Sequence, residues 1–188
     1  MGDVRPDYPL KTDRLLLRPF QPEDLDDFLA YRLRAEIYPY LDGDVPDRAT
    51  ATELFSDKLT HHELTEEGQR LTLAVYWPEA DRVIGDVVLM WHSEQHRQGE
   101  LGYIFNPEFH GKGLAKEAAA KALELGFEEL GLHRIIAQCD PRNEPSWRLM
   151  ERLNMRREAH FRHKEIFKGE WGDLLVYALL EEEYERAS

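Results

Sequence analysis

The sequence predicts a single α+β domain in which a mixed, mostly antiparallel sheet of about seven strands is flanked by about four helices. Segments with the alternation of strands are interspersed with helical segments, in the order strand, two helices, three strands, helix, strand, helix and two strands. The 188 residues suffice for one compact domain and are too few for two ordinary ones. We therefore expect one domain over residues 1–188, with a core over residues 11–181 and short polar tails.

Charge and composition exclude several classes of protein. The chain has 24 Lys and Arg against 37 Asp and Glu, so the phosphate backbone of a nucleic acid would be repelled. Cys139 is the single cysteine, and no spacing typical of a metal site joins it to the histidines, which we assign to the surface or to strand ends: His61, His62, His92 and His96. No apolar run is long enough to cross a bilayer, and the N-terminus lacks a signal peptide. We expect a cytoplasmic protein without metal, membrane or nucleic acid.

The first elements are a strand and a helix joined by an acidic turn. Residues 12–20 predict a strand with Leu15 and Leu17 on one side. Residues 21–24, Gln-Pro-Glu-Asp, then open a helix with acidic residues at its positive end. Residues 37–47 combine Pro, Gly and three aspartates with two tyrosines, which predicts an ordered loop.

A second helix and a hairpin follow this loop. Leucines among charged residues predict the helix over residues 48–66. Residues 71–77 and 83–91 predict two strands joined by a turn. Gly85 within the second strand indicates a bulge or a close approach of another backbone.

The stretch 99–131 is the one around which the chain is organised. Leu101, Tyr103 and Phe105 alternate with other residues as a partly buried strand requires. Small residues then recur at helical spacing, which lets a helix lie close against a sheet, and Gly131 is placed to end it. The small residues are Ala115, Ala118, Ala119, Ala122 and Gly126.

A glycine turn joins this strand to this helix. Residues 110–115 read His-Gly-Lys-Gly-Leu-Ala, so a ligand can approach the backbone where side chains are missing. The first turn of a helix also presents unpaired N–H groups and a positive dipole end, which suit a phosphate. The alternative is an ordinary glycine turn beside a solvated lysine face. Neither the dinucleotide fingerprint nor the P-loop motif is present.

The last third of the chain predicts a strand, a short helix and a hairpin. Residues 133–140 are a buried strand, and Asn143 is a suitable N-cap for a helix that runs to Leu153. Residues 155–168 and 171–180 predict the terminal hairpin, which a polar tail follows.

Three motifs resemble the GNAT superfamily of acetyltransferases. Gly113 and Ala115 match the last two positions of the family's Arg/Gln-x-x-Gly-x-Gly/Ala loop, and His110 stands in the Arg/Gln position. The opening TDRLLLRPF resembles the branch that includes N-terminal acetyltransferases of ribosomal proteins. The run of Asn143, Ser146 and Leu149 resembles the family's next helix. The resemblance covers nearly the whole chain and implies the GNAT acyl-CoA N-acyltransferase fold.

Two residues depart from the family pattern in that helix. Met150 replaces the tyrosine that many members use as general acid. Asn154 replaces the closing glycine, but asparagine also tolerates the left-handed conformation. The first departure affects the mechanism that the resemblance implies, and the second affects nothing.

The resemblance implies acetyl-CoA as cosubstrate and no metal. The backbone of the strand over residues 103–105 would pair with the pantetheine arm, and the glycine turn would hold the pyrophosphate. The residues that the resemblance assigns to the cosubstrate are Tyr103, Ile104, Phe105, His110, Gly111, Lys112, Gly113, Leu114, Ala115, Asn143 and Ser146.

Acetyl transfer to an amine requires a neutral amine and a protonated or hydrogen-bonded leaving thiolate. Glu100, on the strand, is the candidate general base, acting through water; the alternative is a carboxylate at the rim of the cleft. Ser146 is the candidate acid, because this branch often keeps a serine near the cofactor sulfur. A serine would polarise the thiolate rather than fully protonate it, and the alternative role is hydrogen bonding at the start of the helix.

The acceptor that these features predict is a cationic primary amine, in a monomer or homodimer. A protein or peptide N-terminus is favoured, with a polyamine or aminoglycoside as the alternative; a non-catalytic acyl-CoA-binding module is the alternative from another class. Tyr38 and Tyr40 are candidates for an aromatic wall of the acceptor site or for an ordinary helix connection. The acidic residues expected at its rim are Asp42, Asp44, Asp47, Glu165, Glu170 and Asp173.

Overall fold

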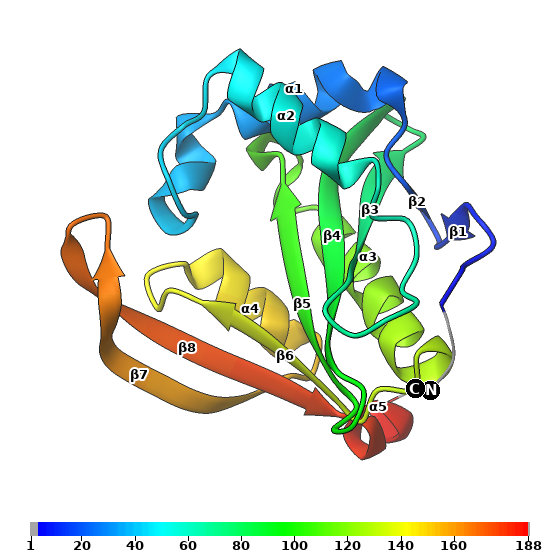
Figure 1. Cartoon of the computed structure of the whole chain (residues 1–188), viewed down its shortest axis with the longest axis vertical. Coiled ribbons are helices and arrows are strands. Elements are labelled where there is room, and N and C mark those ends of the chain that lie inside the picture. Colours follow the sequence, from blue (N-terminus) through cyan, green and yellow to red (C-terminus); the bar gives the residue numbers. More distant parts are fainter. Residues whose placement is uncertain (1–3, 188) are drawn as a thin grey trace.

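The computed structural model describes residues 4–187, whose strands form one sheet of eight strands (Figure 1). The strands are β1 (Leu10–Lys11), β2 (Leu16–Arg18), β3 (Arg70–Trp77), β4 (Arg82–Ser93), β5 (Gln98–Phe105), β6 (Arg134–Cys139), β7 (Arg156–Phe167) and β8 (Glu170–Leu180). Their order is β1-β2-β3-β4-β5-β6-β8-β7, and every neighbouring pair is antiparallel except β5 and β6. The predicted α+β class and mixed sheet are confirmed, with the two-residue β1 as an addition.

Helices cover both faces of the sheet (Figure 1). The helices are α1 (Leu25–Arg32), α2 (Arg48–Lys58), α3 (Leu114–Glu124), α4 (Glu144–Arg152) and α5 (Glu181–Ala187), with short turns η1 (Pro22–Asp24), η2 (Ala35–Tyr40), η3 (Pro107–Phe109) and the π-helical η4 (Leu125–Glu129). α3 and α4 pack on one face, and α1 and α2 pack on the other. Among the described residues, no helix combines the length and the apolar character needed to cross a membrane.

Three predicted elements differ from the structure. The strand predicted over residues 12–20 is confined to Leu16–Arg18, because the N–H of Thr12 donates to the carbonyl of Leu15 and folds the residues before it into a turn. α2 ends at Lys58 rather than near residue 66, because the chain turns inward and the fully buried Leu64 forms a bridge with Val4. The predicted polar tail is the helix α5. The ring of Tyr184 stacks on Phe127, with 4.9 Å between centroids, which anchors α5 against the end of the central helix.

The core on the α1 and α2 face is aromatic and contains one buried carboxylate. The rings of Phe20, Phe28 and Phe55 contact one another at centroid distances of 5.2 to 5.7 Å. Asp86 on β4 is 1% exposed, and it accepts from Tyr31 Oη at 2.7 Å and from Lys58 Nζ at 2.8 Å. Because a buried charge is costly without partners, these two contacts fix α1 and α2 on the sheet.

Gly85 stands where two backbones come unusually close. A Cβ atom at this position would lie 2.5 Å from the carbonyl oxygen of Ile104, so no larger residue fits. The β3–β4 register also shifts beside it, between Val75 and Tyr76. The predicted bulge or close approach at Gly85 is therefore confirmed.

β5 and β6 run parallel for only three residue pairs and then separate (Figure 1). The last pair joins Glu100 to Ile136, whereas β5 continues to pair with β4 as far as Phe105. The N–H of Asn106 donates to the C=O of Ile84, so by alternation Ile104 directs its backbone groups to β4. Tyr103 and Phe105 direct theirs to the opposite edge, which no strand of the described chain covers beyond Glu100.

Candidate active site

The glycine turn presents backbone to the start of α3. Gly111 and Gly113 both have φ of 78°, a left-handed conformation that favours glycine. No side chain caps α3, and its first internal hydrogen bond runs from the N–H of Glu117 to the C=O of Gly113. A Cβ atom added at Gly111 would meet nothing within 4 Å. The amides of residues 114–116 therefore lack helical acceptors beside open space, which suits an anion.

The side chains of this turn are engaged elsewhere. His110 Nε2 lies 3.3 Å from the carbonyl oxygen of Phe105, and the Lys112 ammonium lies 5.8 Å from the ring centroid of Trp77. Leu114 is 2% exposed and belongs to the core. The turn therefore offers its backbone, rather than these side chains, to a ligand.

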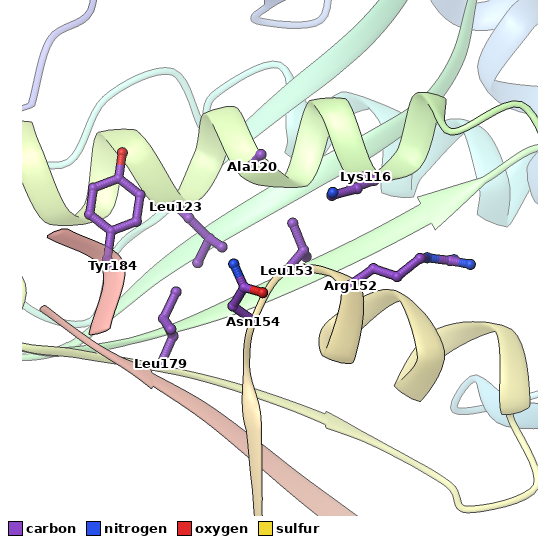
Figure 2. A pocket seen from close by; sticks show the side chains of 8 residues that line it. All are labelled: Lys116, Ala120, Leu123, Arg152, Leu153, Asn154, Leu179 and Tyr184. Carbon is purple, nitrogen blue, oxygen red and sulfur yellow. The ribbon is translucent and has the colours of Figure 1, made fainter. Parts of the chain in front are cut away.

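A groove between α3 and the C-terminal end of α4 carries two basic side chains. Figure 2 shows Lys116 on α3 facing the end of α4 that carries Arg152, above an apolar floor that includes Leu153. Neither basic group has an ion pair within the described chain, although most arginines of this acidic protein do. The groove therefore extends the positively polarised surface of the glycine turn along α3.

Ser146 lies in the first turn of α4, directly beside the open edge of β5. The hydroxyl of Tyr103 lies 3.0 Å from both Ser146 Oγ and the Ser146 carbonyl oxygen. Burial raises the pKa of Tyr103, so its phenol stays protonated. Burial also raises the pKa of Cys139 on β6 to about 11, although a hydrogen bond with Ser146 opposes this. Three protonated groups thus meet on the α4 face of the gap between the strands.

Glu100 lies on the opposite face of the sheet at the point where β5 and β6 part. Its carboxylate is 2.9 Å from His92 Nε2, and it accepts from Gln138 Nε2 at 3.2 Å. Alternation along β5 places Glu100 and Tyr103 on opposite faces. The described residues therefore place a carboxylate and a hydroxyl pair on the two sides of one gap.

Several predicted residues of α4 have a defined structural place. Asn143 holds the N-cap position, but its side chain makes no capping hydrogen bond. Met150 is 1% exposed and packs in the core. Asn154 has φ of 62°, which confirms the left-handed conformation expected of it.

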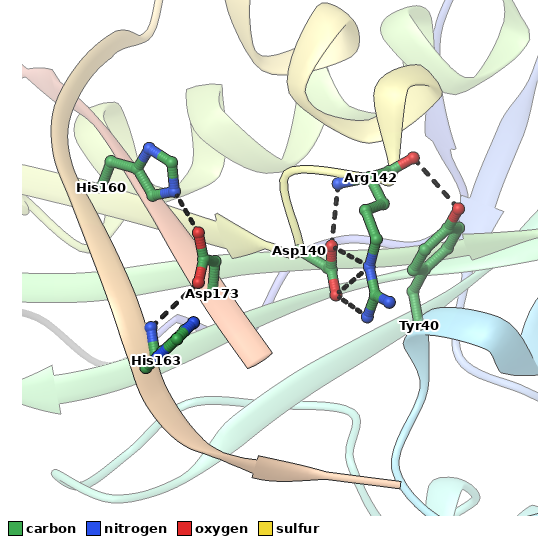
Figure 3. Close-up of polar contacts among 6 residues, drawn as sticks. All are labelled: Tyr40, Asp140, Arg142, His160, His163 and Asp173. Atoms are coloured by element: carbon green, nitrogen blue, oxygen red, sulfur yellow. Dashed lines mark hydrogen bonds and ion pairs between the residues drawn. The ribbon is translucent and has the colours of Figure 1, made fainter. Parts of the chain in front are cut away.

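The two tyrosines of the early loop have different roles. Tyr38 is 5% exposed and donates to the carbonyl of Arg32, so it belongs to the core and not to an acceptor wall. Tyr40 donates to the carbonyl of Arg142 at 3.0 Å, just before α4 (Figure 3). Lys168 at the tip of the β7–β8 hairpin donates to the carbonyl of Gly43. The early loop and the late hairpin therefore meet across the open end of the sheet.

The acidic residues expected at the rim divide into two groups. Asp47 caps α2 through the N–H of Thr50, and Asp173 accepts from the N–H of His163 and lies 2.7 Å from His160 Nε2 (Figure 3). The bond from the His163 amide lowers the pKa of Asp173. These two carboxylates have structural partners. The others are exposed at the loop and the hairpin, and they are Asp42, Asp44, Glu165 and Glu170.

Sequence reasoning missed contacts made between distant elements. His92 lies near the end of β4, in agreement with the prediction of a surface or strand-end position, but it also contacts Glu100. No local pattern predicts the contact between the phenol of Tyr103 and Ser146. Alternation along the two strands could have indicated the first contact, whereas the second required the position of α4.

A comparison with family models matches residues 14–156 to the acetyltransferase (GNAT) domain. The chain belongs to the GNAT family of acetyltransferases. This GNAT chain is 36% identical over 176 residues to the uncharacterised N-acetyltransferase YnaD of Bacillus subtilis (strain 168). The alignment covers 93% of this chain and 98% of YnaD. Its fold matches a crystal structure of a GNAT-family acetyltransferase from Bacillus anthracis with a TM-score of 0.81 and 32% identity, over 92% of this chain and 98% of that one.

The GNAT enzyme shows no metal centre in its described part. No group of three or more His, Cys, Asp or Glu residues there could hold a metal ion. The glycine turn, the Lys116 and Arg152 groove and the open edge of β5 instead fit an elongated anionic molecule such as acetyl-CoA.

Replacement of Ser146 by alanine is expected to lower kcat on the order of tenfold, because a hydrogen bond to a charged group such as the departing thiolate contributes about 1.5 kcal/mol or more. The affinity for CoA should change little, because the backbone of the glycine turn is untouched. Steady-state kinetics at saturating acetyl-CoA measure the effect. Ser56→Ala, which removes a helical serine on α2 that bonds to the carbonyl of Thr52, is the matched control. An unchanged kcat in Ser146→Ala would contradict the assigned role.

Proposed function

We propose that the protein transfers the acetyl group of acetyl-CoA directly to a primary amine, with Glu100 as general base and Ser146 assisting departure of the thiolate. The observation that carries this proposal is the pair of groups across the gap between β5 and β6. Glu100 lies at the last paired residue on one face, and the Tyr103–Ser146 pair lies on the other. An amine on the Glu100 side and a thioester in the gap would be in line for attack.

Acetyl-CoA supplies an activated acetyl thioester, and the residues of the chain hold it and move protons. The backbone of Tyr103 faces the open edge and can pair with the pantetheine arm and donate to the thioester carbonyl. The amides after Gly113 hold the pyrophosphate. The backbone groups of Ile104 pair with β4, so Ile104 contributes to the site by packing and not by hydrogen bonds to the pantetheine arm.

Proton transfer completes the reaction. The ammonium group loses one proton to Glu100 through water, and the neutral amine attacks the thioester carbonyl. As the C–N bond forms and the C–S bond breaks, a second proton leaves the nitrogen through water and protonates the departing thiolate, which gives free CoA thiol. Ser146 donates a hydrogen bond to the sulfur as it leaves, and the phenol of Tyr103 holds Ser146 at the edge of β5 by donating to the Ser146 carbonyl oxygen. His92 holds the carboxylate of Glu100 in place. Ser146 and Tyr103 together take the role of the tyrosine general acid whose position Met150 occupies in this chain.

The acceptor that we favour is a protein or peptide N-terminus. The chain is 36% identical over 90 residues to YdaF of Bacillus subtilis, whose name describes a ribosomal N-acetyltransferase, and 29% identical over 100 residues to spermidine N(1)-acetyltransferase of Escherichia coli (strain K12). Each match spans about half of both chains. A polyamine is therefore the second candidate. Both acceptors are cationic, which agrees with the exposed carboxylates at Asp42, Asp44 and Glu170.

The experiment compares N-terminal peptides, spermidine and aminoglycosides as acceptors, with release of free thiol as the readout. N-terminal peptides should give the highest kcat/KM, and high salt should lower it because the exposed carboxylates act on encounter. Higher kcat/KM for spermidine would transfer the assignment to the polyamine class. Activity confined to uncharged acceptors and insensitive to salt would refute the electrostatic argument. An absence of thiol release with every amine, despite CoA binding, would identify a non-catalytic acyl-CoA-binding module.

A further inference from the structure

Arg14 connects the N-terminal part of the chain to the glycine turn. Its Nε donates to Glu117 Oε2 at 2.8 Å, and its Nη2 lies 2.7 Å from the same oxygen. Its Nη1 donates to the carbonyl oxygen of Lys112 at 3.0 Å. The backbone N–H of Arg14 and the hydroxyl of Thr12 both donate to Glu117 Oε1. One arginine thus joins the first turn of α3 to the peptide between the two left-handed glycines.

The direction of this peptide decides what the glycine turn can bind. In a trans peptide the C=O and the following N–H point in opposite directions. Because Arg14 holds the Lys112 carbonyl on its own side, the N–H of Gly113 points away from Arg14. A rotated peptide would direct a carbonyl oxygen toward the ligand and would repel a phosphate.

The same contacts neutralise a carboxylate that stands close to the turn. Glu117 lies in the first turn of α3, where its charge would oppose a bound anion. Burial raises the pKa of Glu117, but the bonds from Thr12 and Arg14 outweigh it and hold the pKa below its usual value. The carboxylate is therefore ionised and paired with the guanidinium.

We infer that Arg14 is a positioning residue for the cosubstrate: it fixes the Lys112–Gly113 peptide so that the Gly113 amide faces the pyrophosphate of acetyl-CoA. The inference rests on the proposed function, because it takes the glycine turn as the pyrophosphate site. Arg14 acts in this role through the peptide that it holds, because its Nε and Nη2 contact Glu117 and its Nη1 donates to the carbonyl of Lys112.

The opposite end of the same helical segment supplies a matched control. Arg97 donates through Nε to the carbonyl of Gly131 and pairs through Nη2 with Glu181 at 2.8 Å. Its side chain is 41% exposed, against 45% for Arg14. Both arginines therefore contact a backbone carbonyl next to or at a glycine and also a carboxylate, but only Arg14 makes these contacts at the glycine turn of residues 110–115.

The test compares Arg14→Ala with Arg97→Ala by calorimetric titration with CoA and by thermal unfolding. Arg14→Ala should weaken CoA binding on the order of tenfold, as expected for losing a charge-assisted hydrogen bond. The KM for acetyl-CoA should rise in parallel while kcat at saturation changes by less than about twofold. Arg97→Ala should lose comparable thermal stability and keep wild-type affinity. Wild-type affinity in folded Arg14→Ala would overturn the inference.

A double variant separates two effects of Arg14 on CoA affinity: the orientation of the Lys112–Gly113 peptide and the neutralisation of the Glu117 charge. Arg14→Ala combined with Glu117→Ala should bind CoA as weakly as Arg14→Ala, because the Lys112 carbonyl remains unheld. Wild-type affinity in the double variant would overturn the positioning role, since Arg14 would then act only by cancelling the charge of Glu117. If the wild-type chain itself fails to bind CoA, the proposed function fails, and the inference fails with it.

Discussion

Replacement of Gly113 by glutamate is expected to abolish binding of acetyl-CoA. The residue has φ of 78°, so any side chain there is strained, and the new carboxylate would stand at the amides that receive the pyrophosphate. Two like charges about 4 Å apart cost about 4 kcal/mol near a protein surface, which corresponds to a loss of affinity of more than about a hundredfold. Calorimetric titration with CoA measures the loss.

Gly131→Glu is the control for this variant. Gly131 has φ of 70° just after the same helical segment, and a Cβ atom there meets nothing within 4 Å. It therefore incurs the same backbone strain without placing charge at the glycine turn. Gly131→Glu should keep its affinity for CoA. Unchanged affinity in folded Gly113→Glu would instead exclude the glycine turn as the pyrophosphate site.

Replacement of Glu100 by glutamine is expected to lower kcat about a hundredfold, the lower end of what general-base catalysis contributes. Glutamine can still accept from His92 or Gln138 but cannot take the proton of the ammonium group. The loss should be largest at low pH, where removal of that proton is hardest. Turnover measured across pH at saturating substrates reports the effect.

Glu158→Gln serves as the control, because Glu158 is also a carboxylate on a strand with a defined partner, Arg134. Its kcat should equal that of the wild-type chain. CoA affinity in Glu100→Gln should also be unchanged, because the carboxylate lies away from the glycine turn. Full turnover in Glu100→Gln at every pH would mean that water alone accepts the proton.

Local patterns were sufficient to predict the elements that hold the site. Alternation predicted β5, small residues at helical spacing predicted the central helix, and the unusual backbone of Gly85 and Asn154 was inferred from residue type. The sequence predicts a longer α2 than the structure has, because Leu64 leaves the helix and forms a bridge with Val4. No local pattern predicts this long-range contact. Packing between distant segments, rather than helix propensity, therefore determines where α2 ends.

The contacts that refine the candidate site are also long-range. Arg14 and Lys112 are 98 residues apart, and Tyr103 and Ser146 are 43 apart. Periodicity describes which face of an element a residue occupies, but it does not describe which other element lies opposite. The roles of Arg14 and of the Tyr103 phenol therefore emerge only when the sheet and its helices are assembled.

The order of the strands constrains when this protein can fold during synthesis. β8 follows β7 in the chain but lies between β6 and β7 in the sheet, where it pairs with six residues of β6 and buries Leu175, Tyr177 and Leu179. A nascent chain that has emerged only through β7 leaves the edge of β6 and the apolar side of α4 uncovered. Exposed edges of this kind invite pairing with other chains. The sheet is completed only after residues 170–180 leave the ribosome, so its C-terminal half depends on protection until β8 has emerged.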